Sequence, residues 1–182
     1  NDIVISIKSS DVRNTYAANI EVAKMCDYPL HLGVTEAGTE LSSAIKSSAA
    51  LGGLLLAGIG DTVRISITGD PVREVVCAKE LLKSLGLKKG GVTFVSCPTC
   101  GRTKIDLVAL ANAVEQKLCG CDKTIKVAVM GCVVNGPGEA READIGVAGG
   151  DGCGVIFRKG KIIKKVTEER LLPELLSEVD KL

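Results

Sequence analysis

The amino-acid sequence predicts an α/β protein made of two units. Three strand-like runs, each followed by a helix-like run, occupy the first half of the chain. The glycine- and lysine-rich stretch "GLKKGG" at 86–91 then interrupts this pattern, and shorter mixed elements follow it. Repeated strand–helix units predict a parallel sheet with right-handed crossovers. We therefore expect one α/β domain over residues 1–88 and a small α+β domain over residues 89–182.

In the first half, each strand-like run is followed by a segment with a helical pattern. "DIVISIK" precedes a helical stretch over 12–26, and "PLHLGVTEAG" precedes a second over 40–56. "TVRISIT" precedes a third, which begins near Pro71, a residue favoured in the first turn of a helix, and ends at Leu85 before a glycine. The pattern therefore predicts three βα units.

Alternation along two of these strands places cations on the face away from the helices. In the first strand, isoleucines at positions 3, 5 and 7 share one face and leave Lys8 on the other. In the third, apolar side chains at 63, 65 and 67 face the helices, which leaves Arg64 and Ser66 on the opposite face. In a β/α barrel this end of the strands is the mouth, where catalytic residues gather. A single cation there is ordinarily solvated or salt-bridged, but a pair on one face favours a phosphate clamp.

The second unit begins with a short strand at 92–95 and a helix over about 105–118. The strand "IKVAVMGC" and a loop rich in glycine and proline follow. Short strands near Ile145, Val155 and Ile162 precede a final amphipathic helix that begins near Glu168.

Eight cysteines without a secretory pattern favour reduced thiols and metal or cluster chemistry in a cytoplasmic setting. Cys97 and Cys100 form a C-x-x-C pair directly after a strand, and Cys132 ends another strand before "VVNGPGE". Such a pair alone is weak support in a cysteine-rich chain. Three thiolates with the loop carboxylate Glu139 would, however, suit an iron–sulfur cluster in which one iron differs from the other three.

Two other readings of the cysteines stay open. A structural zinc site would use Cys97, Cys100, Cys119 and Cys121, although it leaves the loop after Cys132 unexplained. A thiol–disulfide redox protein would use Cys97 and Cys100 alone, but four residues separate that pair from the next predicted helix. His31, at the entry of its strand, is interpreted as structural.

Composition argues against two classes of partner. The 23 basic and 22 acidic residues nearly cancel, and aromatic residues make up 2% of the chain. Neither a basic surface nor a stacking platform for nucleic acid is therefore expected. No uninterrupted apolar stretch reaches the roughly 18 residues of a membrane span.

Several motifs together resemble the hydroxymethylbutenyl diphosphate synthase family, the iron–sulfur enzymes of the methylerythritol phosphate route to isoprenoids. They are "SCPTCGR", "GCVVNGPGEA", "HLGVTEAG" and "GIGDTVRISIT", and the resemblance covers essentially all 182 residues. It implies the last three βα units of a TIM-type barrel, followed by a small iron–sulfur domain of reductase-like α+β fold. The implied reaction is the two-electron reductive ring opening and dehydroxylation of methylerythritol cyclodiphosphate.

Carried onto this sequence, the resemblance implies roles for particular residues. The 4Fe-4S cluster ligands fall on Cys97, Cys100, Cys132 and Glu139. The diphosphate-binding residues fall on Lys8, Arg64 and Ser66. Glu36, which alone would be interpreted as a helix-start carboxylate, takes the place of the catalytic glutamate. Asn135 takes the place of a residue near the substrate hydroxyls.

The resemblance also implies a ferredoxin or flavodoxin as electron donor and a homodimer in the intact enzyme. Family chains are about twice as long, and the earlier barrel arginines that bind the diphosphate have no counterpart here. The sequence begins at Asn1 within a strand-like run, so we expect a piece of a longer protein. Three βα units cannot close a barrel, so we expect little or no turnover from this piece alone and association through its open sheet.

Overall fold

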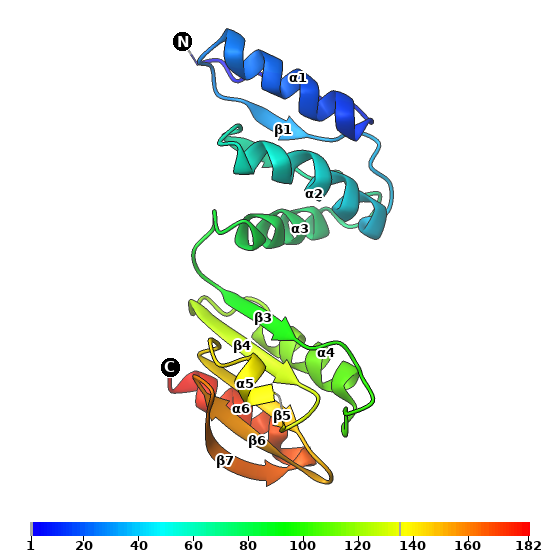
Figure 1. The fold of residues 1–182 in the computed structure, drawn as a ribbon. Helices are drawn as coiled ribbons and strands as arrows, with labels where there is room; N and C mark the ends of the chain where they lie inside the picture. Colours follow the sequence, from blue (N-terminus) through cyan, green and yellow to red (C-terminus); the bar gives the residue numbers. More distant parts are fainter. Residues whose placement is uncertain (1, 135) are drawn as a thin grey trace. The chain divides into compact units, whose positions relative to one another are not determined.

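The computed structural model describes residues 2–134 and 136–182, and the chain divides into two compact units, Asn1–Lys88 and Lys89–Leu182. The division falls within the glycine- and lysine-rich stretch at 86–91. Figure 1 shows alternating helices and strands in the first unit and a sheet with helices in the second. The protein is thus α/β. None of the described helices is long and apolar enough to cross a bilayer.

The first unit contains three helices and two short parallel strands among its described residues. In chain order they are α1 (Val12–Met25), β1 (His31–Gly33), α2 (Glu40–Leu56), β2 (Thr62–Arg64) and α3 (Pro71–Ser84). The carboxylates of Asp11 and Asp70 cap α1 and α3 by accepting hydrogen bonds from first-turn N–H groups. β1 pairs with β2 so that Gly33 lies opposite Arg64. One apolar core joins these helices to the strands.

The alternation read from the third strand is confirmed. Ile65 is buried in the core, and the side chains at 63 and 67 pack against it, whereas Arg64 is exposed. In the first strand, Ile5 packs against the same core, but Ile3 is 52% exposed.

The strands of the first unit are shorter than the sequence predicts. Residues 2–8 form only one bridge to the described strands, between Ile5 and Leu30. The carbonyl of Ile7 accepts instead from the side-chain amide of Asn19 on α1. β2 ends early because helix side chains occupy its next backbone groups. The N–H of Ile67 donates to Glu74 on α3, and the carbonyl of Ser66 accepts from Ser43 on α2.

The second unit is a five-stranded mixed sheet with the order β3-β4-β5-β6-β7. β3, β4 and β5 are parallel, and β6 and β7 run antiparallel to their neighbours. Its elements are β3 (Val92–Ser96), α4 (Leu107–Leu118), β4 (Ile125–Met130), α5 (Gly136–Glu139), β5 (Ile145–Gly149), β6 (Cys153–Arg158), β7 (Lys161–Thr167), a 3-10 turn (Glu168–Arg170) and α6 (Leu171–Asp180).

The two faces of this sheet are covered differently. Helices α4 and α6 cover one face, where their leucines pack on valines and isoleucines of β4, β5 and β6. The alternate residues of those strands form a second core with Ala140 and Ala143, beside the short helix α5. Figure 1 shows α5 lying over the sheet near β4 and β5. Among the described residues, the second face is therefore covered only by the four-residue helix α5 and its flanking loop, whereas two longer helices cover the first.

Candidate functional site

Lys8 and Arg64 lie close together in the first unit, with a glycine between them. A Cβ at Gly33 would stand 3.1 Å from the carbonyl oxygen of Arg64 and 3.1 Å from Cε of Lys8. The glycine thus leaves room for the stem of Lys8 across β1 toward β2. The pKa of Lys8 is lowered, first by partial burial and then by the positive charge of Arg64. Two cations whose charges act on one another form a site that favours an anion.

His31 lies on this same face, which the sequence interpretation did not recognise. Its Nδ1 is 2.8 Å from Oγ1 of Thr62, and its backbone carbonyl accepts from Ser6. The pKa of His31 is lowered, first by burial and then by the charges of Lys8 and Arg64. Strand alternation could have predicted this placement, because His31 precedes Gly33 by two residues and so lies on the same face of β1.

Glu36 occupies a strained backbone position at the end of β1. Its φ is 52°, in the left-handed region that non-glycine residues rarely adopt, and its side chain is exposed. Neighbouring contacts hold the segment: the N–H of Thr35 donates to the carbonyl of Ser9, and the N–H of Thr68 donates to that of Gly38. These two hydrogen bonds link the loop that contains Glu36 to the loops that follow residues 2–8 and β2. Strain of this kind, imposed by surrounding bonds, is common at functional positions.

The cysteine loops of the second unit leave neighbouring parallel strands at the same edge of the sheet. Cys97 directly follows β3, and Cys132 comes two residues after β4. The N–H of Gly131 donates to Sγ of Cys97 at 3.2 Å. Cys97 and Cys132 are both half-buried, and all eight cysteines are free thiols. The fold thus brings the cysteine after β3 against the residue that precedes Cys132.

Thr103 contacts both the turn at Cys100 and Gly131, which follows the end of β4. The N–H of Cys100 donates to Oγ1 of Thr103 at 3.2 Å, and the N–H of Thr103 donates back to the carbonyl of Cys100 at 3.0 Å. A Cβ at Gly131 would stand only 2.9 Å from Oγ1 of Thr103. The N–H of Lys104 also donates to the carbonyl of Gly131. Sequence reasoning missed Thr103, which has no signature beyond its place three residues after Cys100.

The thiol of Cys100 is exposed and lies among donors. Its pKa is lowered, mainly by the backbone N–H of Arg102, while partial burial opposes the shift and the hydroxyl and N–H of Thr103 add to it. These contacts favour the thiolate, which is the form that binds metals.

The loop after Cys132 folds back onto the sheet. The N–H of Gly136 donates to the carbonyl of Cys132 at 3.0 Å. A Cβ at Gly136 would be 2.8 Å from Cβ of Met130 and 2.9 Å from Cβ of Ala148, so only glycine lets α5 lie this close to the strands. The backbone of Glu139 ends α5. Its side chain and the whole of Asn135 lie outside what the structure describes.

Among the side chains that the structure describes, no three His, Cys, Asp or Glu residues lie together as a metal site. The donor set nevertheless suits an iron–sulfur cluster, because three free thiols lie on two loops that hydrogen bonds hold together. Cys119 and Cys121 follow the far end of α4, a twelve-residue helix about 18 Å long. The four-cysteine zinc site is therefore not assembled in this structure.

Comparisons with known proteins agree with the two-unit division. Residues 1–79 match the model of the GcpE TIM-barrel domain, and residues 93–181 match that of the GcpE protein C-terminal domain. A relative from Clostridium acetobutylicum is 63% identical over 180 residues, which are 99% of this chain and 52% of the relative. One from Caldanaerobacter subterraneus is 60% identical over 181 residues, or 100% of this chain and 51% of the relative.

A third relative, from Desulfotalea psychrophila, is 60% identical over 180 residues, which are 99% of this chain and 50% of the relative. All three carry the name 4-hydroxy-3-methylbut-2-en-1-yl diphosphate synthase (flavodoxin). The chain spans about half the length of the curated relatives it matches.

Proposed function

The chain belongs to the GcpE family, and from this premise we propose that it is the substrate- and cluster-binding part of a hydroxymethylbutenyl diphosphate synthase. Residues 1–88 would be the last three βα units of a TIM-type barrel, and residues 89–182 a reductase-like cluster domain. The observation that carries the proposal is the hydrogen bond from Gly131 to Cys97, which brings the two cysteine loops together.

The overall reaction consumes two electrons and two protons. One ring C–O bond of the cyclodiphosphate breaks to free the diphosphate arm, a hydroxyl oxygen leaves as water, and a C=C bond forms. Cys97, Cys100, Cys132 and Glu139 would hold a 4Fe-4S cluster. When bound, that cluster supplies single electrons and a Lewis-acidic iron.

The first unit would bind and orient the substrate. Lys8 and Arg64 would bind the diphosphate oxygens, and Ser66 would donate a hydrogen bond to them. This placement is supported by the crossing of Lys8 over Gly33 toward Arg64. Glu36, held in a strained exposed position, would transfer a proton to the departing oxygen, and Asn135 would orient the substrate hydroxyls.

The relatives' names favour a flavodoxin as electron donor over a ferredoxin. A homodimer of the intact enzyme and a cytoplasmic location, where thiols stay reduced, complete the proposal. The chain alone should show little or no turnover, because three βα units do not close a barrel.

A chimera tests the function directly. Residues 1–182 would replace the matching half of the Clostridium acetobutylicum relative, and the purified protein would be incubated anaerobically with the cyclodiphosphate and a reductant. We expect the hydroxymethylbutenyl diphosphate product from the chimera and none from its Cys132→Ser variant. A chimera that folds and loads iron but forms no product would overturn the proposed function.

A further inference from the structure

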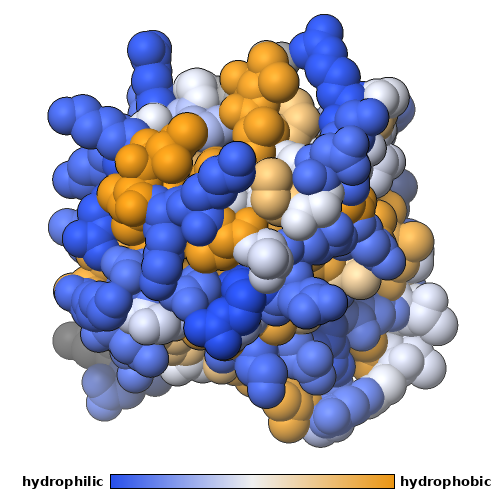
Figure 2. Space-filling model, turned by 90° about the horizontal axis from the view of Figure 1, so that it is seen from below, coloured by the Kyte–Doolittle hydropathy of each residue, from blue (hydrophilic) through white to orange (hydrophobic). Residues whose placement is uncertain are grey.

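The hairpin of β6 and β7 concentrates positive charge. Residues 156–167, "IFRKGKIIKKVT", contain five cations and no carboxylate, in a chain whose 23 basic and 22 acidic residues otherwise balance. β7 is an edge strand of the sheet, and most of its residues are exposed. Figure 2, seen from below Figure 1, shows small apolar areas separated by protruding hydrophilic side chains.

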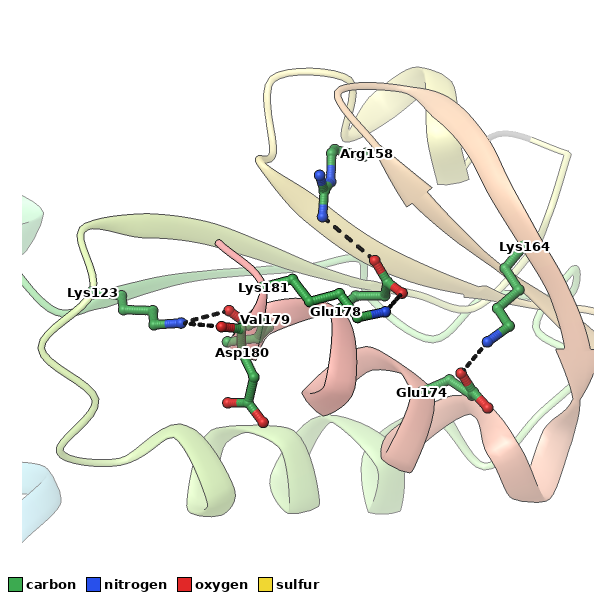
Figure 3. A network of polar contacts seen from close by, with 8 residues as sticks. All are labelled: Lys123, Arg158, Lys164, Glu174, Glu178, Val179, Asp180 and Lys181. Atoms are coloured by element: carbon green, nitrogen blue, oxygen red, sulfur yellow. Dashed lines mark hydrogen bonds and ion pairs between the residues drawn. The ribbon is translucent and has the colours of Figure 1, made fainter.

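Two of the five cations of this hairpin are neutralised by carboxylates of α6. Arg158 pairs with Glu178, and Lys164 pairs with Glu174. Figure 3 shows both pairs, together with Lys123, whose ammonium donates to the carbonyl oxygens at the end of α6. These cations therefore stabilise the packing of α6 on the sheet and are not available to a partner.

Among the described side chains, no carboxylate forms an ion pair with the cations on the α5 side. Lys165 pairs with Val155 in the ladder, and Ile162 pairs with Phe157, so both point to the face that α5 covers. Lys159 stands at the turn with a φ of 49°. Each of these three side chains is exposed, and no ion pair joins Lys159 or Lys165 to another described residue. Ile162 itself is 57% exposed.

Arg141 extends this surface toward α5. A Cβ at Gly160 would stand 2.8 Å from Cβ of Arg141 and 3.2 Å from the carbonyl oxygen of Pro137, so the hairpin turn touches the segment that follows Cys132. Of the nearby carboxylates, that of Asp144 already accepts from the N–H of Lys126, whereas Glu142 is exposed. We call Arg141, Lys159, Ile162 and Lys165 the β7 basic face.

The β7 basic face lies on the same sheet as the cysteine loops. The register of the sheet runs from the end of β4 to β7 in three steps. Met130 of β4 is opposite Ala148 of β5, and Ala148 is opposite Val155 of β6. Val155 is in turn opposite Lys165 of β7. Three strand spacings separate Lys165 from Met130, about 14 Å in all. A redox protein seated on this face would therefore lie beside the loops proposed to hold the cluster.

We infer that the β7 basic face is the docking surface for an acidic electron-carrier protein of the flavodoxin class. Exposed Ile162 supplies an apolar centre, and Lys159, Lys165 and Arg141 supply a basic rim. The inference rests on the proposed function, because only that function requires an external electron donor. Lysines on an edge strand also oppose pairing with other chains.

The test is charge reversal with the apo chain, so that it does not depend on cluster loading. Binding of an oxidised flavodoxin with net negative charge would be measured by calorimetry for the wild type and for Lys159→Glu/Lys165→Glu. Lys79→Glu/Lys117→Glu is the matched control, since it makes the same change in net charge at exposed lysines on α3 and α4. Size-exclusion chromatography and circular dichroism would verify that each variant is folded and unaggregated.

We expect the β7 variant to bind at least about tenfold more weakly and the control to bind as the wild type does. Raising the salt from about 0.05 M to about 0.3 M should weaken wild-type binding. Equal binding by the wild type and the β7 variant, or no wild-type binding at low salt, would overturn the inference. Normal flavodoxin binding by a chain that fails to load iron would instead count against the proposed function.

Discussion

The backbone N–H of Gly131 donates a hydrogen bond to Sγ of Cys97 at 3.2 Å. This contact joins the loop after β3 to the loop after β4, and it places the first cysteine against the residue before Cys132. Donors to sulfur and the residues that orient ligand loops tune both the retention and the potential of metal sites. Gly131 and Thr103, which lie between the proposed ligands, should therefore influence the cluster without binding it.

Thr103→Val should weaken cluster retention. Valine has the shape of threonine but cannot accept the hydrogen bond from the N–H of Cys100, which would leave that loop less ordered. We expect less iron and sulfide per chain, faster bleaching in air and a shifted midpoint potential, on the order of a tenfold loss in cluster lifetime. Thr103→Ser keeps the hydroxyl and should behave as the wild type. If valine and serine variants retained the cluster equally, Thr103 would have no positioning role.

Gly131→Ala should destabilise the second unit. The added Cβ would lie 2.9 Å from Oγ1 of Thr103 and 3.2 Å from Cδ2 of the buried Leu107. Overpacking of this kind typically costs about 1–3 kcal/mol in the free energy of unfolding, which denaturant titration would measure. Gly101→Ala is the control, because no atom lies within 4 Å of its added Cβ.

The same crowding predicts non-additivity. Thr103→Ala would remove the nearest clashing atoms, so the double variant Gly131→Ala/Thr103→Ala should lose less stability than the two single losses added together. Simple additivity would mean that Thr103 does not contact position 131 in solution.

Removing either cation of the Lys8–Arg64 pair should weaken anion binding by the first unit. Pyrophosphate binding, measured by calorimetry, should fall about tenfold or more in Lys8→Ala and in Arg64→Ala, since each removes a charge-assisted hydrogen bond. Lys79→Ala changes the net charge equally at an exposed helix position and should bind as the wild type does. Equal affinity in all four proteins would show that the pair is not an anion site.

His31 should make the first unit less stable in acid. Burial, with the charges of Lys8 and Arg64, lowers the pKa of His31 below its ordinary value of 6.5. The unfolded chain therefore takes up the proton first as the pH falls through that value, and stability falls until the folded pKa is passed. The protection factor for amide exchange in β1, which corrects for the intrinsic pH dependence of exchange, should decrease as the pH falls below about 6.5. His31→Asn should flatten this dependence, and an unchanged pH dependence in that variant would assign the effect to another group.

Much of this arrangement was predictable from short-range patterns. The helix ends follow from Asp11, Asp70 and Pro71, which act within one turn. Period-two alternation predicted that Lys8 and Arg64 share a face, and the charges of the two side chains do interact in the structure. The C-x-x-C spacing singled out Cys97 and Cys100 as candidate ligands. These signals depend on residues close together in the chain.

Other features depend on contacts between distant residues and left little trace in the sequence. The early end of β2 results from Glu74 and Ser43, which lie on helices and bind strand backbone. The role of Thr103 depends on its distance from Gly131, which is 28 positions away. The partition of the β7 cations between two faces requires the register with β6, including its irregularity at Ile156 and Phe157.

The most direct test of the account is the metal content of the chain purified without oxygen. Iron, sulfide, zinc and the visible spectrum would be measured for the wild type, for Cys132→Ser and for Cys119→Ser. We expect a brown protein with about four irons per chain, as a four-iron cluster requires. The colour should be lost in Cys132→Ser and retained in Cys119→Ser. Zinc in place of iron, lost in Cys119→Ser but unaffected by Cys132→Ser, would contradict this expectation.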